Sequence, residues 1–360
     1  MAIILVFFVH YHALFSHYLA TDSVSFSISH FSWSIGPSGV DLFFVLSGYL
    51  IYGIVMRKHT SYLKFMFRRA QRIYPTFLFV LAAYIALSFL FPRETKLPSD
   101  VAEASLLILE NVALLPGVFN INPIITVAWS LSYEWFFYAV IPIVVSILRM
   151  KRWGVLSRVL FITIFSGAYI ICGMGIELPH SHMLMFASGM LLYELANSIW
   201  LKSKLSRTGE VFAIVIFVAT FPFIYFLQSR QIGPDPNTVL WDVSIIATLY
   251  GGYFWFFMYA LNYDGIVRRA LSYTPLRWLG NISYSYYLLH GLALNGIALG
   301  LKQVPFASQY GIIIFWIGLP LAFLTTIGIS TILFVQVERR FSLLKKTDAQ
   351  VRGMAFGSSS

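Results

Sequence analysis

The stretch 1-MAIILVFFVHYHALFSHYLA-20 decides the fold class, because sixteen of its twenty residues are apolar or aromatic. A run of about 20 such residues is long enough to cross the hydrocarbon core of a bilayer as a helix. The segment also contains three histidines, His10, His12 and His17. It has neither the basic start nor the small-residue cleavage site of a secretory signal peptide, so we interpret it as a retained first span.

The composition extends this interpretation to the whole chain of 360 residues. Hydrophobic residues make up 58% and charged residues only 11%, whereas soluble domains contain about 25% charged residues. The single cysteine, Cys172, excludes a disulfide framework and a thiolate metal site. The net charge of +10 comes from short basic runs between apolar segments, which indicates membrane topology and not nucleic-acid binding. An all-α, polytopic integral membrane protein is predicted.

Ten apolar segments are long enough to be membrane spans. They cover about residues 2–20, 36–56, 73–91, 125–148, 155–177, 179–200, 209–228, 240–262, 278–301 and 311–336. The segment 101–119 is interrupted by Glu103, Glu110 and Pro116, and we interpret it as an interfacial helix. Residues 1–336 then form one integral-membrane domain, and residues 337–360 form a basic, flexible cytoplasmic tail.

The loop charges predict the orientation of these spans. If the N-terminus is cytoplasmic, 21 of the 25 basic residues fall in cytoplasmic loops or in the tail. The four on the outer side are Arg93, Lys96, Arg230 and Lys302. Cytoplasmic loops of membrane proteins are enriched in Lys and Arg, so both termini are predicted to be cytoplasmic. The chain shows no repeat at a fixed period, which disfavours a transporter built from inverted repeats.

Ionisable side chains within the spans are candidates for a functional site, because each costs about 2.5–3.5 kcal/mol to insert at the centre of the membrane. A helix rise of about 1.5 Å per residue places His10 near the midplane, Asp41 about 7 Å below the outer boundary and Glu134 about 13 Å deep. His290 lies beyond the middle of an outward-running span. These four side chains could therefore share one cavity. Weaker candidates, near the ends of their spans, are His182, Glu194 and Asp242.

Each of these residues also has a structural alternative. A lone histidine can simply bond a neighbouring helix, and Asp41 could cap the first turn of its span, where the positive helix end favours a carboxylate. Glu134 lies too deep for a cap and could instead pair with a histidine or an arginine. His10 and His12 point about 160° apart on a helix, so only one of them can face a given cavity. His17 lies close to the outer interface.

The basic segment 64-KFMFRRAQRIYP-75 is of a different kind. It places Arg69 and Arg72 on one face of a helix, with Arg68 one turn before Arg72. Guanidinium groups on one face are suited to bidentate recognition of phosphate. The alternative is a plain cytoplasmic anchor. The scattered His, Asp and Glu residues lack the spacing of metal ligands, so no metal site is predicted.

Six motifs follow one another along the chain: 5-LVFFVHYHALF-15, 39-GVDLFFVLSGYLI-51, 67-FRRAQRIYP-75, 129-WSLSYEWFFYAVIP-142, 186-FASGMLLY-193 and 278-WLGNISYSYYLLH-290. Taken together and in this order, they resemble the acyltransferase 3 family of bacterial membrane acyltransferases. The resemblance implies transfer of an acyl group, usually acetyl, from cytoplasmic acyl-CoA to a hydroxyl of a glycan or a lipid-linked saccharide. It also implies a place in the bacterial plasma (inner) membrane, among membrane lipids. No permanently bound cofactor is expected, since acetyl-CoA is a co-substrate.

The same resemblance implies roles for single residues. His10 corresponds to the first-span histidine, which would act as general base or as carrier of the acyl group. Asp41, Glu134 and His290 correspond to further catalytic positions, and one of the two carboxylates would orient the ring of His10. The phosphates of the coenzyme would be held by the arginines of the basic segment, Arg68, Arg69 and Arg72.

The chain departs from the family pattern in two places. The arginine usually found at the cytoplasmic end of the first span would precede Met1, so either the natural chain is longer or this contact is missing. Trp135 stands where relatives often have a second acidic residue. Without the extracytoplasmic hydrolase-like domain of some relatives, a stand-alone transferase is expected. The alternative function is a multi-span transporter or flippase for a glycan or a lipid. The oligomeric state is not predicted.

Overall fold

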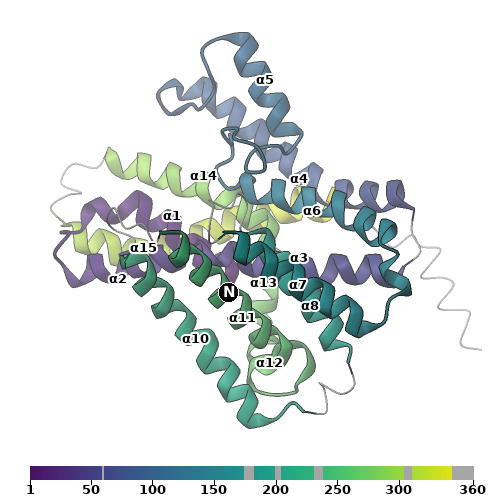
Figure 1. The fold of residues 1–360 in the computed structure, drawn as a ribbon. Helices are drawn as coiled ribbons and strands as arrows, with labels where there is room; N and C mark the ends of the chain where they lie inside the picture. Colours follow the sequence, from purple (N-terminus) through teal and green to yellow (C-terminus); the bar gives the residue numbers. More distant parts are fainter. Residues whose placement is uncertain (59–60, 174–181, 199–203, 231–237, 304–309, 343–360) are drawn as a thin grey trace, which may run out of the picture.

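The computed structural model describes residues 1–58, 61–173, 182–198, 204–230, 238–303 and 310–342. Helices dominate this part of the chain, which contains no strand apart from an isolated bridge between Pro116 and Phe119. The long helices pack into a bundle, and α5 (Val101–Val112) stands apart from it at the top of Figure 1. The all-α prediction is confirmed for the described residues.

Every predicted span overlaps a helix. The bounds are α1 (Ala2–Phe15), η1 (Ser16–Tyr18), α2 (Val24–Ile35), α3 (Ser38–Arg57), α4 (Tyr62–Leu90), η2 (Pro92–Glu94), α5 (Val101–Val112), α6 (Ala128–Ile147), η3 (Met150–Arg152), α7 (Val155–Gly173), α8 (Met183–Ala196), α10 (Arg207–Arg230), α11 (Thr238–Asn262), α12 (Ile266–Leu271), α13 (Thr274–Asn281), α14 (Ser283–Lys302), α15 (Gly311–Leu333) and the π-helix η5 (Phe334–Ser342).

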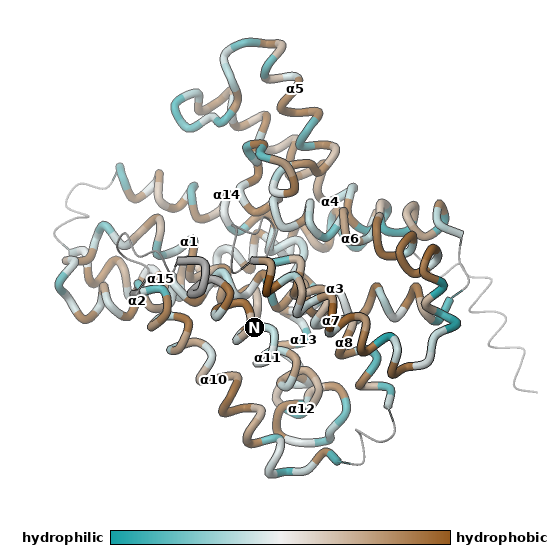
Figure 2. The backbone as a smooth tube through the Cα atoms, viewed as in Figure 1, coloured by the Kyte–Doolittle hydropathy of each residue, from teal (hydrophilic) through white to brown (hydrophobic). Residues whose placement is uncertain are grey.

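Seven helical segments of the described chain are long and apolar enough to cross a membrane. They are Val24–Arg57, Tyr62–Leu90, Ala128–Ile147, Val155–Cys172, Arg207–Ser229, Val243–Asn262 and Gly311–Ser342. The helices α1 and α8 are apolar but shorter, with 14 residues each. Figure 2 shows the long helices mostly in brown, the hydrophobic colour, with teal residues gathered in the connecting segments. The structure therefore supports a membrane protein, while the count of ten spans and the cytoplasmic termini stay predictions.

The basic segment and the third predicted span form a single helix. α4 runs for 29 residues from Tyr62 through Pro75 to Leu90. Proline is tolerated inside membrane helices because neighbouring groups can satisfy the backbone carbonyl that it leaves free. Arg69 and Arg72 are consequently attached rigidly to the membrane-embedded part of the same helix.

The last helix of the described residues, η5, continues α15 and packs against α4. Its Val337, Glu338 and Ser342 are buried. Glu338 accepts a hydrogen bond from the backbone N–H of Ser285 over 3.1 Å and another from the Ser285 hydroxyl. Residues 337–342, the beginning of the predicted tail, thus belong to the helical bundle, and residues 343–360 lie outside the described residues.

Two packing features position the candidate site. α3 crosses α8 at a pair of glycines, because a Cβ on Gly48 would collide with the carbonyl of Phe186 and a Cβ on Gly189 with that of Val45. Small residues allow helices in membranes to approach each other closely. The other feature is a cluster of buried apolar side chains that joins α1 to α14 and α15. Within this cluster the Tyr11 hydroxyl donates a hydrogen bond of 2.6 Å to the Phe315 carbonyl.

Candidate active site

The helices α1 and α14 bring His10 and His290 into contact. The two ring centroids lie 4.9 Å apart, and the ring planes meet at 69°, an edge-to-face arrangement. His290 is fully buried, and its ring stacks on that of Tyr286 at 5.3 Å. His10 is half-buried. The two histidines that are 280 positions apart in the chain therefore form one pair of imidazoles inside the bundle.

Hydrogen bonds within α14 fix the tautomer of His290. Its Nδ1 lies 3.0 Å from the carbonyl oxygen of Tyr286 and 2.9 Å from that of Tyr287. Since carbonyl oxygens only accept hydrogen bonds, Nδ1 must carry the proton. In the neutral ring Nε2 then keeps a free lone pair, and this atom is buried without a hydrogen-bond partner in the described part of the protein. An unused proton acceptor therefore lies beside the ring of His10.

Tyr287 connects the histidine pair to α6. Its ring centroid lies 6.2 Å from that of His290. Its hydroxyl donates to the carbonyl of Val127 over 3.1 Å and lies 2.6 Å from the hydroxyl of Ser130. These contacts hold the first turns of α14 against the start of α6, the helix that carries Glu134.

Glu134 lies at the meeting point of α3, α4 and α6. Its Oε1 accepts a hydrogen bond of 2.8 Å from Ser47 on α3 and a second one from Tyr138, one turn further along α6. The ring of Tyr138 also packs under the guanidinium group of Arg69, whose central carbon lies 5.9 Å from the ring centroid. A negative charge, two hydroxyls and a positive charge are thus assembled in one layer of the bundle.

The three arginines of α4 differ in their surroundings. Arg69 is half-buried between the rings of Phe65 and Tyr138, and its Nε has no hydrogen-bond partner among the described residues. Arg72, one turn further on, is exposed and interacts electrostatically with Arg69 and Glu338. Arg68 is exposed. Arg69 therefore has the position from which a guanidinium group can contact a ligand inside the bundle.

The structure gives the two candidate carboxylates partners other than His10. Asp41, buried in the first turn of α3, lies 2.7 Å from Nδ1 of His182, which directly precedes α8. The close crossing of α3 and α8 produces this contact. Sequence reasoning ranked His182 among the weaker candidates because of its place near a span end. The sequence did contain a sign of this pair, because Asp41 and His182 were both expected near the outer boundary of the membrane.

A family comparison decides which class of protein this arrangement belongs to. The family model described as an acyltransferase domain matches residues 1–335. The chain belongs to the acyltransferase 3 family. The six motifs were therefore interpreted correctly, and the membrane-embedded histidines and carboxylates lie within the domain of an acyl-transferring enzyme family.

Two curated relatives of this acyltransferase carry informative names. The exopolysaccharide production protein ExoZ of Rhizobium meliloti (strain 1021) is 29% identical over 281 residues, which cover 75% of this chain and 81% of ExoZ. The O-acetyltransferase OatA of Staphylococcus aureus (strain NCTC 8325 / PS 47) is 26% identical over 281 residues, which cover 71% of this chain and 45% of OatA. The alignment thus covers less than half of OatA. No solved structure matches the chain.

Sequence reasoning missed one charged residue of this acyltransferase within electrostatic range of His10. Lys96, counted as an outer-loop charge, is near enough to His10 for the two groups to interact electrostatically. Its Nζ donates hydrogen bonds to the hydroxyl of Thr126 over 2.7 Å and to the carbonyl of Pro123 over 3.2 Å. Both acceptors are neutral, so these bonds leave the positive charge available to an anionic group of a substrate. A loop residue gives no periodic signal, which explains the omission.

The remaining candidates of the acyltransferase lie elsewhere. His12 contacts α2, where its Nδ1 lies 2.7 Å from the Ser29 hydroxyl, so His10 and His12 face different helices as their phase predicts. His17 is exposed. Glu194 accepts bonds of 2.6 and 2.9 Å from Arg158. The side chain of Asp242 lies outside the described residues, and within the described chain no three His, Cys, Asp or Glu residues gather as metal ligands would.

Proposed function

We propose that this chain is a membrane O-acyltransferase that transfers an acyl group, preferentially acetyl, from cytoplasmic acyl-CoA to a hydroxyl of a glycan or a lipid-linked saccharide. The observation that carries the proposal is the contact between the imidazoles of His10 and His290 inside the bundle. The name of OatA supports acetyl as the transferred group, and that of ExoZ supports a saccharide acceptor. The family match favours this enzyme over a transporter or flippase. The proposed location is the bacterial plasma membrane.

The chemistry requires a group that takes a proton from the acceptor. A hydroxyl is a weak nucleophile, and a neutral imidazole can accept its proton near neutral pH. His10 takes this proton while the hydroxyl oxygen attacks the thioester carbonyl. The tetrahedral intermediate collapses, the carbon–sulfur bond breaks, and the proton passes from His10 to the leaving thiolate. The products are an O-acyl ester and free coenzyme A.

His10 can also act as the acyl carrier. In that route a ring nitrogen of His10 attacks the thioester carbonyl, and the carbon–sulfur bond breaks as the proton of the ring passes to the leaving thiolate. The acceptor hydroxyl then attacks the acyl-imidazole, the bond between the acyl carbon and the ring nitrogen breaks, and the proton of the hydroxyl returns to the ring of His10. Both routes place a positive charge on the ring of His10 at one stage. A covalent stage on His10 would let the acyl group enter from one side of the membrane and leave on the other.

His290 has the role that the sequence analysis gave to a carboxylate. Once His10 is protonated, both of its ring nitrogens are donors. The buried Nε2 of His290, locked as an acceptor by the carbonyls of Tyr286 and Tyr287, offers a nearby lone pair to one of them. In catalytic triads a third residue stabilises the charged form of the general base, and His290 would do the same for His10. Asp41 and Glu134 are bound to His182 and to Tyr138 instead.

The arginines of α4 would bind the donor. Arg69 has an unsatisfied Nε and lies close to Glu134, and Arg72 is on the same helix face. Two guanidinium groups one turn apart suit the diphosphate of a coenzyme A thioester. Arg68, which is exposed, would contribute long-range attraction more than direct contact.

Replacing His10 tests the proposed function. Membranes from bacteria that lack their own copy of the gene and express the wild type or His10→Ala receive [1-14C]acetyl-CoA, and alkali-labile label is counted in the glycan and lipid fractions. We expect His10→Ala to lose at least about 100-fold of the transfer rate, since general bases contribute about 10²–10⁴-fold. The matched control is His17→Ala, an exposed histidine of the same segment. Wild-type activity in His10→Ala would contradict the assignment, provided that both proteins are present in equal amounts.

A further inference from the structure

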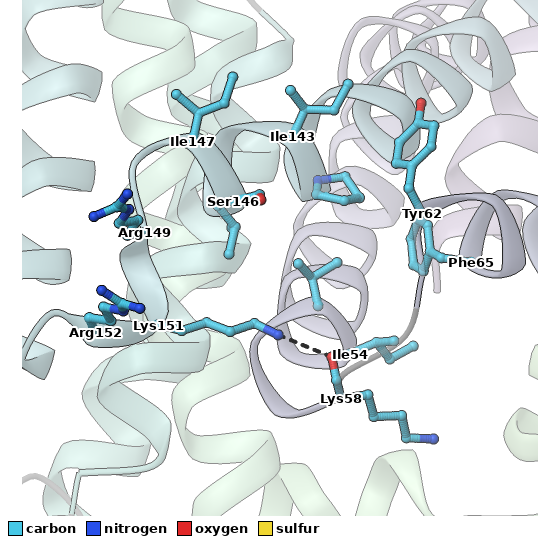
Figure 3. A pocket seen from close by; sticks show the side chains of 13 residues that line it. Ile54, Lys58, Tyr62, Phe65, Ile143, Ser146, Ile147, Arg149, Lys151 and Arg152 are labelled. Carbon is cyan, nitrogen blue, oxygen red and sulfur yellow. Dashed lines mark hydrogen bonds between the residues drawn. The ribbon is translucent and has the colours of Figure 1, made fainter.

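A cavity of about 590 Å³ lies between the end of α3, the start of α4 and the end of α6. Figure 3 shows its lining side chains. Its lining contains no Asp or Glu. Four basic residues border it, namely Lys58, Arg149, Lys151 and Arg152. Its volume falls in the range of about 300–1,000 Å³ that is typical of small-molecule sites. The loop charges predict that this end of the bundle faces the cytoplasm.

The backbone brings basic side chains to two sides of the cavity, with Arg149 and Arg152 together on one side and Lys58 apart from them (Figure 3). Arg149 lies between α6 and η3 and has a φ of 51°, in the left-handed region that residues other than glycine rarely adopt. The chain then enters η3, so that Arg149, Lys151 and Arg152 lie within four positions of each other. Nζ of Lys151 donates a hydrogen bond of 3.1 Å to the carbonyl of Lys58, which ties η3 to the end of α3 (Figure 3).

The positive charges of this cavity are not neutralised within the described protein. None of the four basic residues takes part in an ion pair there, whereas the neighbouring Arg158 is paired with Glu194 at 2.6 Å. Like charges collected around one concave mouth repel each other and attract anions into it. The cavity is therefore built for a ligand with negative charge.

The cavity also has an aromatic wall and leads towards Arg69. In Figure 3 the rings of Tyr62 and Phe65 lie on the side opposite Arg149 and Arg152. The ring of Phe65 is in turn 5.8 Å from the guanidinium carbon of Arg69. The cavity thus has an aromatic wall and a basic rim, and one ring of that wall also contacts Arg69, one turn further along α4.

We propose that this cavity binds the 3′-phosphorylated nucleoside end of the acyl donor, an inference that rests on the proposed function. The base packs against Tyr62 and Phe65, the phosphate monoester is held by Arg149 and Arg152, and Lys58 adds positive charge on the other side of the cavity. Arg69 and Arg72 then contact the diphosphate, and the flexible thioester arm extends into the bundle towards the histidine pair. An anionic lipid headgroup offers the same phosphate chemistry at a membrane interface, and the experiment separates the two sources.

The test compares acetyl-CoA with 3′-dephospho-acetyl-CoA as donors. The variant is Lys58→Gln with Arg152→Gln, which leaves the Lys151 hydrogen bond and the Arg149 turn intact. The matched control is Arg268→Gln with Arg269→Gln, two exposed arginines of α12 outside the cavity. We expect the wild type and the control to have a KM about tenfold higher for the dephospho donor, a ratio worth about 1.4 kcal/mol. The variant should show this higher KM with both donors and an unchanged kcat.

Each other outcome has a definite meaning. If the variant discriminates between the two donors as the wild type does, the inference is wrong and the proposed function stands. If the variant instead changes only how activity depends on phosphatidylglycerol in nanodiscs, the cavity is a lipid site and the inference is likewise wrong. If the wild type transfers from neither donor, the proposed function fails. In that case equilibrium binding of coenzyme A and 3′-dephospho-coenzyme A to the purified proteins still tests the cavity, with the same tenfold preference expected.

Discussion

His290 is held by its own helix in a state that defines its chemistry. Its Nδ1–H is directed at the carbonyls of Tyr286 and Tyr287 and its ring lies parallel to that of Tyr286 at an angle of 3°, so ring rotation is restricted. The lone pair on Nε2 has no partner in the described structure. A buried polar atom without a partner costs free energy and is usually retained for a reason. At this position the reason we propose is the stabilisation of a protonated His10.

Replacing His290 by phenylalanine tests that role. His290→Phe keeps a flat ring against Tyr286 but removes Nε2, so kcat should fall about 100-fold or more while the KM for acetyl-CoA changes little. The loss of the Nδ1–H bond should cost about 1 kcal/mol of stability, which leaves the protein folded. His12→Phe is the control, because His12 faces α2. A His290→Phe variant with wild-type kcat would show that the imidazole contact is only packing.

At the scale of the element, α4 combines a basic end and a membrane-embedded end in one rigid helix. Successive residues of a helix are rotated by about 100°, so adjacent arginines cannot serve the same cavity. Arg69 is turned inward against Phe65 and Tyr138, and Arg68 is exposed. The helix phase thus separates two residues that the sequence motif presents together.

This phase predicts unequal effects of the arginine substitutions. Arg69→Ala with Arg72→Ala should raise the KM for acyl-CoA about tenfold or more, because charge-assisted bonds to phosphate are lost. Arg68→Ala should change it by less than about twofold, as exposed charges contribute little. Initial rates at varied donor concentration measure both. Equal effects of Arg68→Ala and Arg69→Ala would contradict the assigned helix face.

For the whole molecule, the number of membrane crossings sets where the donor and the acceptor can approach. Ten spans place both termini on one side, whereas the seven long segments alone would place them on opposite sides. The two counts differ by three helices, α1, α8 and α14, which are short or less apolar than the seven long segments. α1 and α8 have only 14 residues each, and polar residues such as Ser285, His290 and Asn295 lower the hydropathy of α14.

Fusion reporters distinguish the two counts. A green fluorescent protein attached after the last residue should fluoresce in a bacterial host, because it matures in the cytoplasm. Alkaline phosphatase inserted after Lys96 should be active, since that loop is predicted to be outside. A dark C-terminal fusion together with an N-terminal fusion that fluoresces would exclude an even number of spans.

The sequence alone determined the helical class, the order of the segments and most of the candidate residues. These follow from local causes, because an apolar segment in lipid must satisfy its own backbone hydrogen bonds and is therefore helical. Depth along a span also follows from counting, which is why His10, Asp41, Glu134 and His290 could be selected. The continuation of α4 through Pro75 was not predictable from the sequence. It depends on whether groups of neighbouring helices satisfy the backbone carbonyl that the proline leaves free.

Only the tertiary structure decided which of these residues meet. Partners on different helices depend on rotation and crossing angle, which are set by contacts such as Gly48 against α8, and no periodicity encodes them. Asp41 consequently pairs with His182, Glu134 with Ser47 and Tyr138, and His10 with His290. The basic cavity has the same origin, because it joins the ends of three helices that are separate in the sequence.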